Sequence, residues 1–383
     1  MAPPTKSKET KKDAKTNRRK TAAKGNQTAA SEGQTPADFL EQMAKMAKNR
    51  SQIYELMKPQ AAYSGDVFVK KVKEKENTKE SVTFPVPFNI RLAVPFSERR
   101  RVKVGNDEEY FSAQYCKLEA TEYMIAQAPT KENHRVFWKA IQQDQTKILV
   151  CLTSEDQMTS SDDPTKCFKY FPTEEGQTME IEQAKGKITV ACKSKTAGSF
   201  EQVKYCLEYS DSEEKIDAAF ESENPSASVS KVHPLTIFHM TTWTGTRPES
   251  GHPLDPAVNI AAFFQEVNKA EVDVLRKTME NFVAPVIIQS MDGIGRGAIA
   301  WVILMLLKDV EKRECFDLPD LIKKLQKMRP GCLSNYYQFA FCFAVALHIG
   351  KSMGWCEKDC TNALTDLTAK FPDRKLNEVG NLA

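Results

Sequence analysis

The sequence lacks an apolar stretch long enough to cross a bilayer as a helix. Its longest apolar run extends from Gly297 to Leu307 and is broken by Lys308, whereas a spanning helix needs about 20 apolar residues. The N-terminus is rich in lysine and has no apolar segment, which excludes an ordinary secretory signal peptide. We therefore expect an intracellular, cytoplasmic protein without a transmembrane segment.

Histidine is also scarce, with five residues in 383, and this argues against a metal centre. Cys356 and Cys360 are spaced like one half of a zinc site, but no second pair has zinc-ligand spacing. We expect no metal and no cofactor. The ten cysteines of an intracellular chain are expected to be free thiols that are mostly buried.

The chain lacks a strong overall charge, since its formal net charge is +3. Nine lysines and arginines lie within residues 1–31, together with almost no large apolar side chain. Such a segment cannot bury enough surface to offset its ordering entropy, so residues 1–36 are predicted to be a disordered basic tail. The cluster Asn17–Lys20 suggests a docking or nuclear-localisation arm; a tail that only adds solubility is the other interpretation.

The hydrophobic pattern predicts one α+β domain over residues 37–375, followed by a C-terminal tail at 376–383. Apolar or alternating runs predict strands at 147–152, 188–192, 203–209, 237–242 and 285–288. Helical spacing predicts helices up to Met57 and at 258–280, 298–310, 317–328, 334–350 and 358–370. A polar stretch at 210–230 predicts a surface loop. The expected architecture is a mixed sheet packed with helices.

A glycine-containing turn between a short apolar strand and an apolar helix is the main functional signal. Gly293 and Gly295 let the backbone approach a ligand closely, and amides at a helix start form an anion-binding nest. Arg296 opens the helix and could clamp phosphate oxygens in bidentate fashion. A tight turn without a ligand is the simpler interpretation of the glycines alone. The candidate phosphate-binding residues are Ser290, Met291, Asp292, Gly293, Ile294, Gly295 and Arg296.

This turn resembles the signature of the protein tyrosine phosphatase family, His-Cys-x-x-Gly-x-x-Arg followed by Ser or Thr. Gly293 and Arg296 hold their places in it. Further segments resemble family motifs in the same order: Ile125–Pro129, Phe137–Trp138, Leu152–Thr153, Lys166–Pro172, Phe238–Trp243, Arg329–Gly331 and Gln338–Phe339. The resemblance extends from about residue 80 to 350. It implies the family's fold, a highly twisted mixed sheet flanked by helices.

The resemblance also implies that the catalytic groups have been replaced. Ser290 stands where the family has its nucleophilic cysteine, and Gln289 stands where it has the preceding histidine. Gly297 replaces the serine or threonine that follows the arginine. The general-acid position is Gly245, which has no proton to give, and the water-positioning glutamine position is Ser334. Loss of a general acid costs roughly 10²–10⁴-fold in rate, so no catalytic residue is expected to be intact.

The remaining pocket positions give mixed indications about phosphotyrosine binding. Trp243 and Gln338 are retained, whereas Ile90 replaces the tyrosine that stacks on the substrate ring. Asp292 would place a carboxylate where a dianion should bind, or it caps the following helix with its side chain turned away. Arg296 could instead be paired internally with an acid such as Asp292.

These features predict a pseudophosphatase, a non-catalytic signalling module that binds, sequesters or scaffolds a tyrosine-phosphorylated protein or another signalling protein. One alternative is an active tyrosine phosphatase that uses Ser290, assisted by Glu249, or an unsuspected cysteine. Another alternative is an adaptor tethered by its basic tail to nucleic acid or to an acidic membrane. The tail has no interleaved aromatic residues, which argues against base stacking.

Overall fold

The structure is a computed structural model that describes most of residues 100–353. Inside that range it leaves out 106–108, 110, 119–120, 164–165, 184–185, 199–201, 213–231, 244–256, 278–283, 313–317, 330 and 334–335. The basic tail at 1–36, the helices up to Met57, the helix at 358–370 and the tail at 376–383, all predicted from the sequence, lie outside the described residues. Within the described part, no helix combines the length and apolar character needed to cross a membrane.

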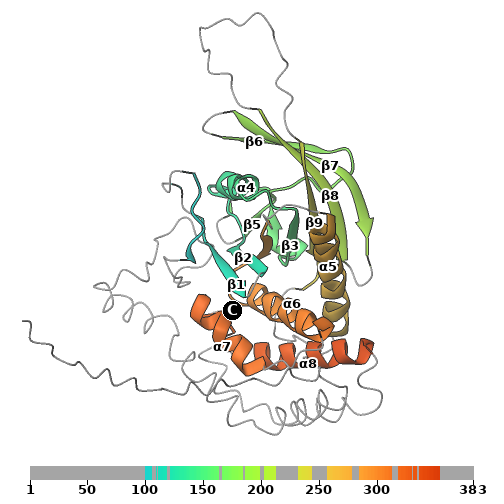
Figure 1. Ribbon diagram of the computed structural model, residues 1–383. Helices are drawn as coiled ribbons and strands as arrows, with labels where there is room; N and C mark the ends of the chain where they lie inside the picture. Colours follow the sequence, from blue (N-terminus) through green and yellow to red (C-terminus); the bar gives the residue numbers. More distant parts are fainter. Residues whose placement is uncertain are drawn as a thin grey trace, which may run out of the picture. The chain divides into compact units, whose positions relative to one another are not determined.

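One mixed sheet of eight strands organises the described residues (Figure 1). Its central strands β2, β10, β3 and β9 pair in parallel, and the outer pairs are antiparallel. In spatial order the strands are β1 (Ala113–Leu118), β2 (Thr121–Gln127), β10 (Val286–Ser290), β3 (Ile148–Cys151), β9 (Val232–Met240), β8 (Gln202–Ser212), β7 (Lys187–Ala197) and β6 (Thr178–Glu182). A two-stranded sheet pairs β4 (Met158–Thr159) with β5 (Cys167–Phe168).

Helices cover both faces of the sheet. The helices are α4 (His134–Gln143), α5 (Ala257–Lys277), α6 (Arg296–Lys312), α7 (Leu318–Met328) and α8 (Tyr336–Ser352). Side chains alternate between the two faces of a strand, and both faces are buried here. Tyr123, Ile125 and Ile288 pack in the cluster that contains α5 to α8, whereas Met124 and Ile287 pack in the cluster that contains α4. The predicted α+β architecture is confirmed.

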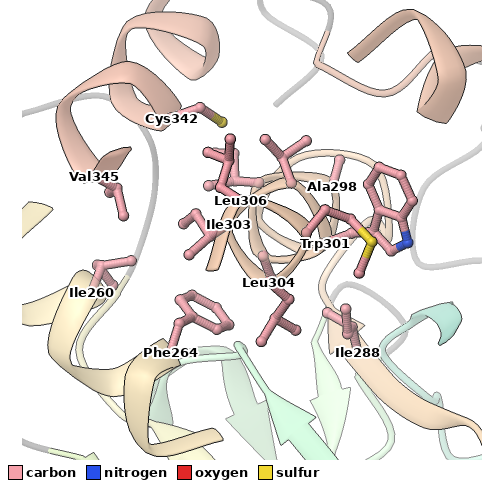
Figure 2. Close-up of a cluster of buried hydrophobic side chains, with 14 of the residues drawn as sticks. Ile260, Phe264, Ile288, Ala298, Trp301, Ile303, Leu304, Leu306, Cys342 and Val345 are labelled. Carbon is pink, nitrogen blue, oxygen red and sulfur yellow. The ribbon is translucent and has the colours of Figure 1, made fainter. Parts of the chain in front are cut away.

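Helix α6 lies at the centre of the larger cluster and is apolar on nearly all sides. Figure 2 shows Ile303 and Leu304 among side chains from α5, β10 and α8. A helix that is hydrophobic all round is buried, and Ala298 to Leu307 are at most 3% exposed. The core therefore fixes the position of the helix that begins at Arg296.

Several predicted boundaries were wrong; the strand expected at 188–192, for example, continues to Ala197. The strand expected at 237–242 begins at Val232 and ends at Met240, although Pro234 lies inside it. The amide of Thr236 donates to Lys147 O at 2.9 Å. The nitrogen of Pro234, two residues earlier, faces the same side of β9 but lies beyond Ile148, the first residue of β3. No ladder hydrogen bond is lost there. The loop expected at 210–230 starts later, since β8 continues to Ser212; residues 213–231 lie outside the described part.

Candidate functional site

The predicted phosphate loop connects β10 to α6 at the carboxyl end of the parallel strands. β10 ends at Ser290, residues 291–295 form the turn, and α6 begins at Arg296. The neighbouring parallel strands β2 and β3 hold β10 on both sides. Because ligands of such sheets bind beyond the carboxyl ends of the strands, this position is suited to a binding loop.

The carbonyl groups of the loop point away from its centre. Ser290 O accepts from Ala128 N at 2.8 Å, and Gly295 O accepts from Ile299 N at 3.1 Å. Gly293 O accepts from Arg329 Nε at 2.6 Å. Since the N–H and C=O of a peptide unit point in opposite directions, several loop amides face inward, as an anion nest requires.

The side chains of Ser290 and Asp292 accept hydrogen bonds from four backbone amides. Gly293 N and Gly297 N each donate to Ser290 Oγ at 3.2 Å. Ile294 N and Gly295 N each donate to Asp292 Oδ1 at 3.0 Å. Asp292 was expected either to repel a bound dianion or to cap the helix with its side chain turned away from the loop. Its hydrogen bonds are those of a helix cap, but its carboxylate faces the loop amides.

Close contacts require glycine at position 293 and leave little room for a side chain at position 295. Gly293 has φ +66°, and a Cβ there would lie 2.7 Å from Arg329 Nη2 and 2.9 Å from the carbonyl carbon of Ala126. A Cβ at Gly295 would lie 3.3 Å from Asp292 Oδ2 and 3.4 Å from Gln338 Nε2. Gln338, which is buried, therefore lies beside Gly295.

Arg296 is held by two groups from distant segments. Its Nη2 donates to Gln157 Oε1 at 2.7 Å, and its Nη1 donates to the carbonyl oxygen of Trp243. The side chain is 7% exposed. Trp243 is itself buried and stacks on Phe341 with ring centroids 5.5 Å apart. The predicted pocket residue Trp243 therefore contacts the loop through its backbone.

A buried hydrogen-bond network supports the strand before the loop. Gln289, at the histidine position, is fully buried; its Oε1 accepts from the Tyr170 hydroxyl at 3.2 Å. Its Nε2 donates to Thr153 Oγ1 at 2.6 Å. The amide side chain thus satisfies both of its polar ends. Met291 and Ile294 are partly exposed.

Several predicted residues cannot be compared with the structure. Ile90, Gly245, Glu249 and Ser334 lie outside the described residues. The structure brings together the seven loop residues, Trp243 and Gln338.

Sequence reasoning missed Gln157 as a partner of Arg296 and Arg329 as a support of the loop. Both are far from the residues they contact along the chain. Arg329 belongs to the Arg329–Gly331 motif, whereas no motif near Gln157 indicates a site.

The fold and this loop together define a class of protein. A loop with inward amides at the carboxyl end of a central parallel strand, followed by a helix that opens on a buried arginine, is typical of phosphate-binding α+β proteins. The chain belongs to the protein-tyrosine phosphatase family, because the sequence model of this family matches residues 88–348.

Curated relatives agree with this assignment. Human tyrosine-protein phosphatase non-receptor type 23 is 26% identical over 67% of this chain and 14% of its own length. Mouse tyrosine-protein phosphatase non-receptor type 20 is 21% identical over 70% of this chain and 58% of its own length. Tyrosine phosphatase-like protein J1 of Microplitis demolitor bracovirus is 22% identical over 63% of this chain and 72% of its own length. The chain thus spans less than two thirds of the first two relatives.

Proposed function

We propose that this chain is a pseudophosphatase that binds a tyrosine-phosphorylated segment of a partner protein and sequesters or scaffolds it in intracellular signalling. The observation that carries this proposal is the chemistry at the nucleophile position. Ser290 is fully buried, and Gly293 and Gly297, the hydrogen-bond partners of its Oγ, are both N–H donors. Neither of these groups can take the hydroxyl proton as a general base would.

The same substitution favours binding over hydrolysis. A nucleophilic thiolate places a negative charge beneath the phosphate, whereas the Ser290 hydroxyl is neutral. Arg296 stays at the helix start, and the glycines keep the amides of the loop close to any ligand. A phosphate held by these groups would be retained because no intact nucleophile attacks it.

Binding of a mixed phosphotyrosine peptide pool at physiological salt tests the proposal. The wild-type chain is expected to bind, and Arg296→Ala is expected to lose binding. Arg296→Lys keeps the positive charge without the bidentate fork and should bind weakly. Thermal unfolding of each variant checks that the loop region is intact. Equal binding by all three folded proteins would show that the peptide does not use this loop.

The alternative of an active hydrolase with an unsuspected cysteine has one observation in its favour. Burial raises the pKa of the Cys151 thiol, but the charge and hydrogen bond of His239, together with hydrogen bonds to Thr153 and Tyr170, leave that pKa lowered. However, Cys151 is 0% exposed, and a phosphate ester cannot reach its sulfur. Phosphate release that survives Ser290→Ala but not Cys151→Ala would revive this alternative.

The tethering alternative concerns the basic tail, which lies outside the described residues. An adaptor held by this tail would show binding to nucleic acid or acidic vesicles that falls steeply with salt. Deletion of residues 1–36 should remove that salt-dependent binding and leave phosphotyrosine binding unchanged. The same deletion tests whether the tail directs the chain to the nucleus in addition to the cytoplasm.

A further inference from the structure

Asp292 occupies the part of the loop in which an anionic ligand would find its donors. Its Oδ1 accepts from the amides of Ile294 and Gly295, each at 3.0 Å. The side chain is 8% exposed, so the carboxylate lies largely inside the structure. A negatively charged oxygen that accepts two converging amides makes the same interaction as a phosphate oxygen in such a nest.

Two buried guanidinium groups lie beside the loop, that of Arg329 on the side to which the Gly293 carbonyl points. Arg329 is fully buried, and its Nη2 has no hydrogen-bond partner among the described residues. That nitrogen lies 2.7 Å from the point that a Cβ of Gly293 would occupy, directly against the loop. Arg296 adds a second buried guanidinium.

In the described part of the chain, the buried acidic side chains are Asp292 and Glu271, and Glu271 is bound to Lys308 and Tyr123. The positive charge of these two guanidinium groups favours a negative group at the loop, such as a phosphate ester.

We infer that Asp292 is an internal competitor for the phosphate site, whose carboxylate must leave the amides of Ile294 and Gly295 before a phosphomonoester binds. This inference rests on the proposed phosphotyrosine binding and adds the residue that limits its affinity. The ligand class is a phosphate monoester dianion, presented on a peptide or as free phosphate. In this structure the carboxylate occupies the amides of Ile294 and Gly295.

Two substitutions distinguish the effect of occupying the loop amides from the effect of the negative charge of Asp292. Asp292→Ala removes both the occupant and its charge, whereas Asp292→Asn removes the charge but keeps an oxygen that can accept both amides. Dissociation constants are measured for a phosphotyrosine peptide and, separately, for inorganic phosphate. Two freed amide donors to a dianion should tighten binding on the order of 10-fold or more in Asp292→Ala. The gain in Asp292→Asn should be clearly smaller.

The outcomes distinguish this inference from the proposed function. If wild type binds, Arg296→Ala does not, and Asp292→Ala binds no tighter than wild type, the inference is overturned and the proposed function stands. Equal gains in Asp292→Ala and Asp292→Asn would also overturn it, because charge alone would explain them. If only Asp292→Ala binds, the inference is supported and phosphotyrosine binding by the natural chain is overturned.

Two controls complete the test. Absence of binding in every folded variant would overturn both proposals. If Asp292→Ala fails to fold because the helix loses its cap, Asp292→Ser, a shorter neutral cap, takes its place and is expected to show the same direction of change. Competition between the peptide and inorganic phosphate shows whether both ligands bind at the same site. If only the peptide binds more tightly to the variant, contacts outside the phosphate group explain the gain in affinity, and the inference is overturned.

Discussion

Ser290 is held by amides that would also stabilise a thiolate, since its Oγ accepts from Gly293 N and Gly297 N. Ser290→Cys should therefore create a thiol of lowered pKa but very little turnover, because glycine at position 245, where the sequence places the general acid, has no proton to give. The double variant Ser290→Cys/Gly245→Asp should release phosphate from a phosphotyrosine peptide roughly 10²-fold faster than the single variant. Steady-state phosphate release measures both rates. A single variant as fast as the double would show that the acid position does not limit the rate.

Gly293 and Gly176 form a matched pair for testing the close packing of the loop. Both have positive φ, +66° and +80°, but a Cβ at Gly176 meets nothing within 4 Å. Gly176→Ala should cost about 1 kcal/mol of unfolding free energy through backbone strain alone. Gly293→Ala should cost roughly 1–3 kcal/mol more, because its Cβ would also press on Arg329 and the backbone of Ala126. Urea unfolding of the two variants measures the difference; equal losses would contradict the close contact.

At the scale of elements, helices α5 and α6 are joined to the sheet by a polar link in which Glu271 and Tyr123 are buried and Lys308 is partly buried. Lys308 on α6 is bound to Glu271 on α5, and Glu271 accepts from the Tyr123 hydroxyl at 2.7 Å. Burial, followed by the Glu271 carboxylate, raises the pKa of Tyr123 well above its usual value. The link thus places three charged or polar groups in an otherwise apolar cluster.

Removing one partner of this link should destabilise the chain strongly. Lys308→Met leaves Glu271 buried without its cation and should cost about 3 kcal/mol of unfolding free energy. The double variant Lys308→Met/Glu271→Gln should recover much of that loss. Lys193→Met breaks the exposed pair with Glu208 and should cost less than about 1 kcal/mol. Chemical denaturation compares the three; a Lys308→Met cost no larger than that of Lys193→Met would contradict the buried link.

Elements with local patterns could be predicted, and those set by distant contacts could not. The apolar run that became β10 and the helix that begins at Arg296 were found from periodicity. The sequence does not predict the start of β9, because a proline such as Pro234 is normally excluded from a strand. It is tolerated where its nitrogen has no partner strand to bond. The partner of Arg296, Gln157, lies 139 residues away, and no local pattern indicates such a contact. The direction of Asp292 was left open, because both orientations fit the same residues.

At the scale of the whole molecule, buried thiols and phenols are a shared feature of both cores. The seven described cysteines are free and six of them are buried, in accord with the sequence prediction. Burial raises the pKa of Cys116 to about 12. Burial likewise raises the pKa of Tyr205 and of Tyr209 to about 12. The folded chain therefore keeps these groups protonated at pH values where an unfolded chain would lose the protons.

This retention predicts a loss of stability in mild alkali. In the unfolded chain thiols titrate near pH 8.5 and phenols near pH 10, so above those values the unfolded state binds fewer protons. For Cys116 the unfolding free energy should be constant below about pH 8 and should then fall by about 1.4 kcal/mol per pH unit, whereas Tyr205 and Tyr209 should each add the same slope only above about pH 10. Urea unfolding under reducing conditions from pH 7.5 to 10.5 measures the slope. Cys116→Val removes one titrating group and should flatten that slope by one such increment; an unchanged slope would mean that Cys116 is not kept neutral by the fold.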